Sequence, residues 1–318
     1  MKASTAAAFE HWESYYRRGE LTTCPMGTDP NYSAEVRAAW EEFFTGLPDG
    51  TRLIDLCTGN GAVALIAKES GALAGKRFEI HGVDRARIQP ALDVAGGAEL
   101  FAGIAFHPGV AAEALPFEAH SMGAVCGQYA LEYTDAGRVL PEIARVLGPG
   151  GRAQFIMHSE ESVLYANGQE SQRLARLIFE RLELFRRCRE LLAAERSGSA
   201  RLQAASQAVT RAAQRLAEAV RASVNPHFGQ QVGQALDALW QRRGQLGPAA
   251  TERELDYIEH EAQSGLRRVR DITRVALSRH AVQKLGSQAL AAGLTQFAFA
   301  PQLHAGHVVG WRVSFARA

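Results

Sequence analysis

The stretch from Leu53 to Leu65 constrains the fold of this chain more than any other. A short apolar run containing Asp55 breaks at a turn with Gly59 and Gly61, and an apolar segment of helical character follows. Strand, tight turn and helix in this order bring free backbone N–H groups and the positive end of a helix to the carboxyl edge of a strand. Open α/β sheets bind their ligands at that edge. The stretch therefore predicts an α/β fold with a nucleotide-type cofactor at this turn.

The identity of that cofactor depends on the acidic residue before the turn. The run Gly59-x-Gly61-x-x-Ala64 also fits the loose dinucleotide pattern G-x-G-x-x-G/A. Asp55 would repel a pyrophosphate on the same loop, whereas it attracts the ammonium group of an amino-acid moiety. The resulting D-x-C-x-G-x-G run resembles motif I of the class I S-adenosylmethionine-dependent methyltransferases, whose usual form is (D/E)-x-G-x-G-x-G. Cys57 stands in place of the first glycine and costs the turn some conformational freedom.

Two further stretches resemble the ribose and adenine motifs of that family. A strand-like run ends in Asp84, which by resemblance is the motif II carboxylate that binds the ribose hydroxyls. Residues 109–117 are similar to the family's G-D-A-x-x-L-P-F stretch, but Ala111 stands where an aspartate usually contacts the adenine amino group. The adenine contact is then expected from Glu113 or from backbone and apolar groups around Ala111.

Residues 123–133 read as a strand and the turn after it, and they resemble motif IV. In this family the residues just beyond that strand face both the methionine end of the cofactor and the methyl acceptor. By resemblance, Gln128 is expected to contact the cofactor, and Tyr129 and Tyr133 to contact the acceptor.

An L-G-P-G-G turn at residues 147–151 precedes a strand that ends at His158, as is frequent in this family. A general base is needed only where the acceptor is a hydroxyl or a protonated amine. His158 and Glu132 are the hypothetical candidates for that role, and each also has a purely structural interpretation.

The resemblance implies a Rossmann-like, seven-stranded and mostly parallel sheet. A C-terminal helix and an antiparallel hairpin, at residues 296–300 and 308–315 around a turn-rich 301–307, complete it. S-adenosylmethionine is the implied cofactor. The implied cofactor-binding residues are Asp55, Cys57, Thr58, Gly59, Asn60, Gly61, Asp84, Ala111 and Gln128.

An aromatic segment precedes the first strand. Phe9, Trp12 and Tyr16 have the spacing of one helical face, and residues 33–46 predict a second helix. Plain packing explains such a segment. The family suggests instead that residues 1–50 form a helical lid, with Tyr15, Tyr16 and the turn at residues 22–27 lining the acceptor pocket.

The region 162–277 changes character, because strands vanish and helical stripes of Leu, Ile and Val replace them. We predict an all-helical insertion here, within a cofactor-binding domain of residues 51–161 and 278–318. Stripes at 174–192 and 202–224 predict two helices, and the capping box Thr251-x-x-Glu254 predicts the start of another. The insertion is expected to mediate homodimerisation or to cap the pocket.

Composition narrows the function classes. The net charge of +1 gives no global reason for a nucleic-acid or membrane partner, and no apolar run approaches the ~20 residues of a membrane span. Four widely spaced cysteines without a C-x-x-C pair argue against a metal site or a disulfide framework. They fit a reduced cytoplasmic protein without a leader peptide.

Three functions remain open. A small-molecule methyltransferase is favoured by the aromatic segment. A methyltransferase acting on protein or RNA would dock through the Arg-rich runs of the insertion, although interspersed glutamates favour a solvated face there. A non-catalytic cofactor-binding module would use the helices for assembly.

Overall fold

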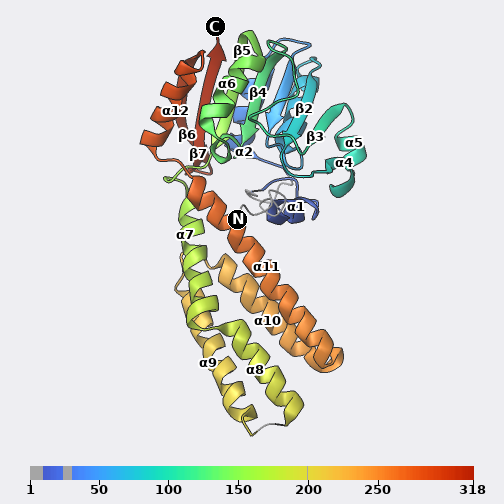
Figure 1. The fold of residues 1–318 in the computed structure, drawn as a ribbon, viewed down its shortest axis with the longest axis vertical. Coiled ribbons are helices and arrows are strands. Elements are labelled where there is room, and N and C mark those ends of the chain that lie inside the picture. Colours follow the sequence, from blue (N-terminus) through green and yellow to red (C-terminus); the bar gives the residue numbers. More distant parts are fainter. Residues whose placement is uncertain (1–9, 24–30, 199) are drawn as a thin grey trace. The chain divides into compact units, whose positions relative to one another are not determined.

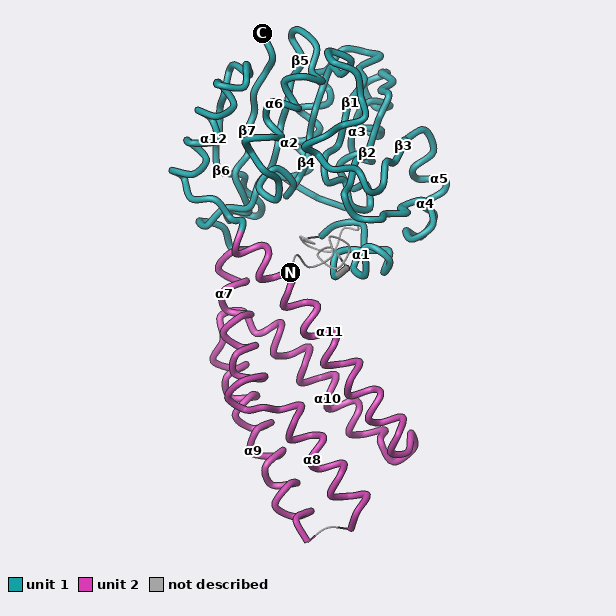
Figure 2. The backbone as a smooth tube through the Cα atoms, in the orientation of Figure 1, with its two compact units in different colours: residues 1–164, 275–318 teal, residues 165–274 magenta. Residues whose placement is uncertain are grey.

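The computed structural model describes residues 10–23, 31–198 and 200–318, and the chain divides into two compact units. Unit 1 comprises residues 1–164 and 275–318, and unit 2 comprises residues 165–274 (Figure 2). Phe9 and the predicted lid residues 24–27 lie outside the described residues. Among the described helices, none is long and apolar enough to cross a membrane.

Unit 1 is built on a seven-stranded sheet with the order β3-β2-β1-β4-β5-β7-β6 (Figure 1). Neighbouring pairs among β1 to β5 are parallel, whereas β7 runs antiparallel to both β5 and β6. The predicted fold class, with its antiparallel C-terminal hairpin, is therefore confirmed. The strands are β1 (Arg52–Leu56), β2 (Glu79–Asp84), β3 (Ile104–Pro108), β4 (Met122–Gln128), β5 (Leu147–Met157), β6 (Leu294–His304) and β7 (His307–Arg317).

The register of the central strands sets the position of the site. Asp55 of β1 lies opposite Gly82 of β2 and Cys126 of β4. Because these three strands are parallel, their carboxyl ends meet at one edge of the sheet, next to the point where the chain order reverses between β1 and β4. Open α/β sheets bind ligands at such a switch point.

Helices of unit 1 cover the sheet. Residues of α6 and α12 share one core with the strands, and Trp311 and Phe155 of that core are fully buried. Helix α2 packs against α3, and its Trp40 and Phe44 are likewise fully buried. The helices are α1 (Glu10–Tyr16), α2 (Ala34–Thr45), α3 (Ala62–Leu73), α4 (Pro90–Asp93), α5 (Gly97–Leu100), α6 (Ala136–Val146) and α12 (Arg279–Ala291), with a 3-10 turn at Leu131–Tyr133.

Two strands differ from expectation. Strand β5 already begins at Leu147, so the segment predicted as a turn pairs with β4 across a register shift between Met122 and Ala124. Strand β6 continues through the region expected to be a turn, and the chain reverses only at Ala305 and Gly306, both of which have positive φ.

A short parallel β-bridge joins the segment before the inserted region to the segment after it. Ser159 pairs with Leu277, the Leu277 N–H donates to the His158 carbonyl at 2.9 Å, and the Glu160 N–H donates to the Leu277 carbonyl at 3.2 Å. The indole N–H of Trp311 donates to the same Leu277 carbonyl at 2.9 Å. The two ends of the inserted region are thus joined by backbone hydrogen bonds between residues of unit 1.

Unit 2 contains long helices that lie side by side (Figure 2) and share an apolar core that includes Leu174, Leu239 and Leu255. The predicted stripe at 174–192 is not one helix, because a π-helical segment and Glu183, with φ of 44°, separate two helices. The elements are α7 (Val163–Arg176), the π-helical segment Leu177–Arg181, α8 (Leu184–Ser197), α9 (Leu202–Arg221), α10 (His227–Leu246) and α11 (Pro248–Val275).

Two details of the predicted stripes were wrong. Helix α11 begins at Pro248, a residue suited to the first turn because it needs no N–H partner there. Thr251 therefore lies inside the helix, where its hydroxyl donates to the Gly247 carbonyl, and it is no capping residue. Val224 follows the end of α9 and is 92% exposed instead of buried.

Several arginines of unit 2 form ion pairs with carboxylates of the same unit. Arg189 pairs with Asp256 and Glu259, and Arg242 pairs with Glu254. Exposed pairs of this kind are worth little stability, but they neutralise the arginine charge locally. This pattern is typical of a solvated face.

Candidate active site

The turn after β1 adopts the conformation that the motif requires. Gly59 and Gly61 have φ of 51° and 84°, in the left-handed region that glycine tolerates best. A Cβ on Gly59 would lie 2.8 Å from the ring of Tyr16, and one on Gly61 would lie 2.9 Å from the ring of Phe106. Cys57 also has a positive φ of 52°, so a residue other than glycine accepts a strained backbone there.

Two buried carboxylates flank this turn. Asp55 accepts hydrogen bonds from the Thr58 hydroxyl at 2.6 Å and the Ala64 N–H at 3.2 Å. Asp84 accepts from the Gly59 N–H at 2.9 Å and the Ala86 N–H at 2.8 Å. Burial raises the pKa of Asp55 to about 7 and that of Asp84 to about 6. No described cationic group forms a salt bridge with either carboxylate.

The aromatic N-terminal segment is fastened to the same turn. The Asn60 amide donates to the Tyr16 carbonyl at 2.9 Å and to the Glu20 carbonyl at 2.8 Å. The Trp12 ring lies 6.2 Å from the Tyr16 ring and 6.1 Å, edge to face, from the Tyr133 ring. Helix α1 therefore brings aromatic side chains from the start of the chain to the cofactor turn and to motif IV.

The end of β4 holds a polar side chain in a fixed orientation. The indole N–H of Trp40 donates to Gln128 Oε1 at 2.6 Å, and both residues are buried. Tyr129 follows with φ of 53°, and its hydroxyl donates to the Val309 carbonyl at 3.2 Å. Its ring stacks on His158 at 4.0 Å with an interplanar angle of 2°.

The two hypothetical bases lie next to each other. The His158 backbone N–H donates to Glu132 Oε1 at 2.6 Å. Burial raises the pKa of Glu132 to about 8 and lowers the pKa of His158 to about 3. At neutral pH Glu132 is thus mostly protonated and His158 is a neutral imidazole.

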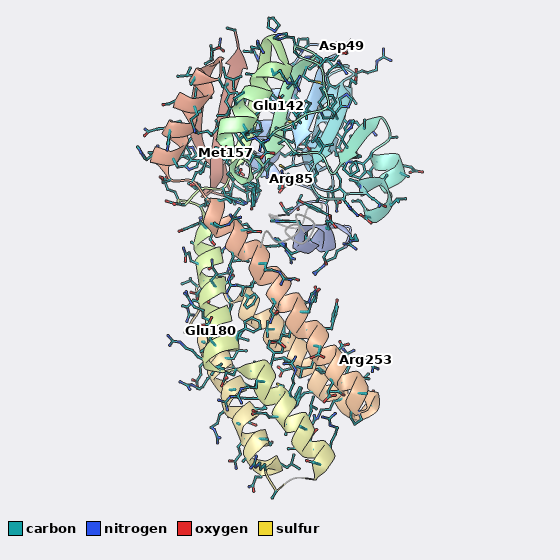
Figure 3. The ribbon with its side chains drawn as sticks, in the orientation of Figure 1. Asp49, Arg85, Glu142, Met157, Glu180 and Arg253 are labelled. Atoms are coloured by element: carbon teal, nitrogen blue, oxygen red, sulfur yellow. The ribbon has the colours of Figure 1, made fainter. Side chains whose placement is uncertain are left out.

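These features lie around one cavity that is partly open to solvent. Among the described residues of its wall, Asp55, Asp84 and Glu113 are acidic and Arg85 is basic. Arg85 follows the end of β2 and is labelled in Figure 3. The aromatic part of the wall comprises Trp12, Tyr16, Tyr32, Tyr129 and Tyr133.

Most of the predicted site residues meet at this cavity. Gly61, Glu132 and Tyr15 are the predicted residues absent from its described wall, and the Tyr15 hydroxyl donates instead to the Thr22 carbonyl at 2.8 Å. The predicted residues that line it are Asp55, Cys57, Thr58, Gly59, Asn60, Asp84, Ala111, Gln128, Tyr16, Tyr129, Tyr133 and His158.

Sequence reasoning missed Tyr32, Arg85 and the partner of Gln128. Trp40 appeared in the sequence only as one aromatic residue of a helix, 88 positions before Gln128. No local pattern links two residues so far apart, so their contact could be found only from the fold. Among the described residues, no group of three or more His, Cys, Asp or Glu side chains could hold a metal ion.

Comparisons with known proteins agree with this geometry. Residues 54–155 match the family model described as a methyltransferase domain. No curated protein matches the chain significantly.

Solved structures with related folds share little sequence with the chain. YcgJ from Bacillus subtilis is 22% identical, with a TM-score of 0.32 over 44% of this chain and 57% of its own. A geranyl diphosphate methyltransferase, solved with geranyl diphosphate and sinefungin, is 21% identical, with a TM-score of 0.33 over 38% of this chain and 45% of its own. The chain thus spans about half the length of these two proteins.

A longer match is a candidate S-adenosylmethionine-dependent methyltransferase from Methanococcus maripaludis, 12% identical with a TM-score of 0.46. It covers 89% of this chain and 85% of its own. With TM-scores below 0.5, these similarities identify no substrate for this chain.

Proposed function

We propose that the chain, whose residues 54–155 match a methyltransferase domain, transfers the methyl group of S-adenosylmethionine to an oxygen, nitrogen or sulfur atom of a small-molecule acceptor. The observation that carries this proposal is the pair of buried carboxylates, Asp55 and Asp84, beside the Gly59 turn. A buried carboxylate without a cationic partner is costly. A ligand that brings positive charge and hydroxyl donors removes that cost.

The residues present fit this cofactor. Each Asp84 oxygen accepts one backbone N–H and keeps lone-pair capacity for a ribose hydroxyl. Asp55 lies where an ammonium group would find a negative charge. Buried polar atoms of the cavity wall, Asn60 Oδ1 and Gln128 Nε2, have no partner among the described residues and can bind a polar ligand.

S-adenosylmethionine supplies, when bound, a methyl group already activated by the sulfonium. The protein then has to bind, align and exclude water, and alignment alone can supply about 7–11 kcal/mol in favourable cases. The aromatic wall around Trp12, Tyr16 and Tyr133 serves the acceptor side in this proposal, since these rings offer apolar surface beside the cofactor turn.

An acceptor that keeps a free lone pair at neutral pH suits this site. The lowered pKa of His158 makes its imidazole a weak base, and the raised pKa of Glu132 leaves this side chain mostly protonated near pH 7. We expect them to orient the acceptor pocket, with Glu132 holding the backbone at His158. Near-normal rates and an unchanged pH–rate profile for His158→Ala and Glu132→Gln would exclude both as bases.

Calorimetric titration of the purified protein with S-adenosylmethionine and, in parallel, with NAD tests the proposal. Binding of the former alone supports it, and a screen of small-molecule acceptors with a labelled methyl donor follows. Binding of NAD, or of neither ligand, would refute the cofactor assignment. Cofactor binding without transfer to any acceptor would favour the non-catalytic module.

We also propose homodimerisation through unit 2, as expected from its amphipathic helices. Docking of RNA through the same unit has less support, because Arg189 and Arg242 are ion-paired with carboxylates of the unit. Mass in solution tests the first idea. Salt-dependent RNA binding would revive the second.

A further inference from the structure

The contact between Trp40 and Gln128 fixes which way the Gln128 amide faces. An indole N–H can only donate, so the Gln128 atom 2.6 Å from it must be the carbonyl oxygen Oε1. The amide nitrogen Nε2 then takes the opposite position. Gln128 is 7% exposed and lines the cavity, and its Nε2 has no hydrogen-bond partner among the described residues. Two N–H donors are therefore held ready at the wall of the cavity.

Several other polar side chains of this wall already donate hydrogen bonds within the protein. Thr58 donates to Asp55, and the Asn60 amide donates to two backbone carbonyls. The Tyr129 hydroxyl donates to the Val309 carbonyl, and the Thr134 hydroxyl donates to the Leu131 carbonyl. The Gln128 amide differs from these groups because its donors have no acceptor among the described residues.

The position of Gln128 indicates what the amide binds. Strands β1 and β4 are parallel neighbours with Asp55 opposite Cys126, so Gln128 ends β4 beside the end of β1. Asp55 offers negative charge to an ammonium group there. In an amino acid the carboxylate is attached to the same carbon as the ammonium, so a carboxylate near Asp55 needs donors close by. A pair of N–H groups matches that need.

We propose that the Gln128 amide binds the α-carboxylate of the methionine moiety of S-adenosylmethionine, and that Trp40 is a positioning residue that holds the amide in its donating orientation. The inference rests on the proposed function. It explains how the site can prefer a cofactor whose amino-acid end is intact. That preference depends on helix α2, which carries Trp40 and lies outside the matched residues 54–155.

The test compares two ligands that differ only in the group concerned. S-adenosylmethionine and decarboxylated S-adenosylmethionine are titrated by calorimetry into the full-length wild-type protein and into Gln128→Met, which keeps the length of the side chain without its donors. Wild type should prefer S-adenosylmethionine. The variant should lose about 10- to 100-fold in affinity for S-adenosylmethionine, as expected for a hydrogen bond to a charged group. Its affinity for the decarboxylated ligand should stay within about twofold of wild type.

Gln154→Met is the matched control. Gln154 lies opposite Cys126 on strand β5 and is also buried, and its amide donates to the Ala39 carbonyl of the same helix α2 at 3.0 Å. It is not part of the described cavity wall. This variant should keep the wild-type preference between the two ligands, even if its melting temperature falls.

Trp40→Phe tests the positioning role. It keeps an aromatic ring but removes the N–H that orients Gln128, so the preference for S-adenosylmethionine should shrink by about 3- to 10-fold. Equal losses for both ligands in Gln128→Met, or no loss for either, would overturn the inference. A wild-type protein that binds neither ligand would instead refute the proposed function.

Discussion

Replacement of Asp55 by asparagine should stabilise the ligand-free protein at alkaline pH and leave a much smaller gain at acidic pH. Burial raises the pKa of Asp55 from 3.8 to about 7, so the folded state resists ionisation of this carboxyl. The hydrogen bonds survive the exchange, because the carbonyl of an asparagine side chain can accept from Thr58 and Ala64 as the carboxylate does. The substituted side chain lacks the charge and carries an amide NH2 group in place of the other carboxylate oxygen.

The sign follows from proton linkage. A carboxyl whose folded pKa is raised contributes stability that is complete below its unfolded pKa and is lost as pH rises through the folded pKa. The full shift corresponds to about 4 kcal/mol at ~1.36 kcal/mol per pH unit. Between pH 5 and pH 8 the wild type should lose about 2.7 kcal/mol through this group, since about two pH units of that range lie below the folded pKa of about 7. The advantage of Asp55→Asn should grow by that amount over the same range.

Urea-induced unfolding at pH 5, 6, 7 and 8, followed by tryptophan fluorescence, measures this difference. A Trp240→Phe background makes the signal specific, because Trp12, Trp40 and Trp311 all belong to unit 1. Asp49→Asn is the control, since Asp49 is exposed and its pKa is lowered by the hydrogen bond from the Arg77 N–H.

The control should show no gain between pH 5 and pH 8. An Asp55→Asn advantage that is the same at every pH would refute the reasoning about the buried charge. Asp55→Asn should also bind S-adenosylmethionine more weakly, because it lacks the negative charge that attracts the ammonium group. A stability gain with a binding loss is the pattern expected of a residue kept for function.

Three other predictions concern different parts of the molecule. Asp84→Ala should weaken S-adenosylmethionine binding at least about 10-fold by calorimetry, because hydrogen bonds to a charged group are lost; unchanged affinity would contradict the ribose assignment. Glu132→Gln should match the wild-type melting temperature at pH 4 and exceed it at pH 8, since burial raises the pKa of Glu132 from 4.5 to about 8 and the stability of the protonated form is lost between these two pH values. A variant that melts below wild type at both values would disprove this. Leu239→Ala should destabilise unit 2 by about 2–5 kcal/mol, because this side chain is fully buried. The Trp240 signal, taken as the difference in fluorescence between proteins with and without Trp240→Phe, measures that loss in denaturant, and S-adenosylmethionine binding should be unchanged.

The central fold was predictable because its signals are local. A strand, a glycine turn and a helix follow one another within residues 53–65, and the carboxyl ends of parallel strands must meet at one edge. The sheet class, the C-terminal hairpin and the methyltransferase domain are thereby confirmed. The roles of individual site residues stay predictions.

What escaped prediction depends on contacts between distant residues or on local backbone strain. Nothing near Trp40 indicates that its indole holds Gln128, and Tyr32 has no motif around it. In unit 2 the capping pattern at Thr251 competed with Pro248, which begins the helix earlier. The unbroken stripe at 174–192 gave no sign of Glu183, where a left-handed backbone separates two helices.

The bridge between Ser159 and Leu277 has a consequence for how such a chain could arise. Backbone hydrogen bonds join Ser159 and Leu277, the residues next to the two ends of the inserted region. Because these ends are held together, a long insertion between them costs the sheet domain little loop-closure entropy. The insertion thus lies at a point where the sheet domain already holds the two ends of the chain next to each other. Its helices can therefore change in number, length and sequence over evolution while the register of β5 and β7, and the cavity at the carboxyl ends of β1, β2 and β4, stay the same.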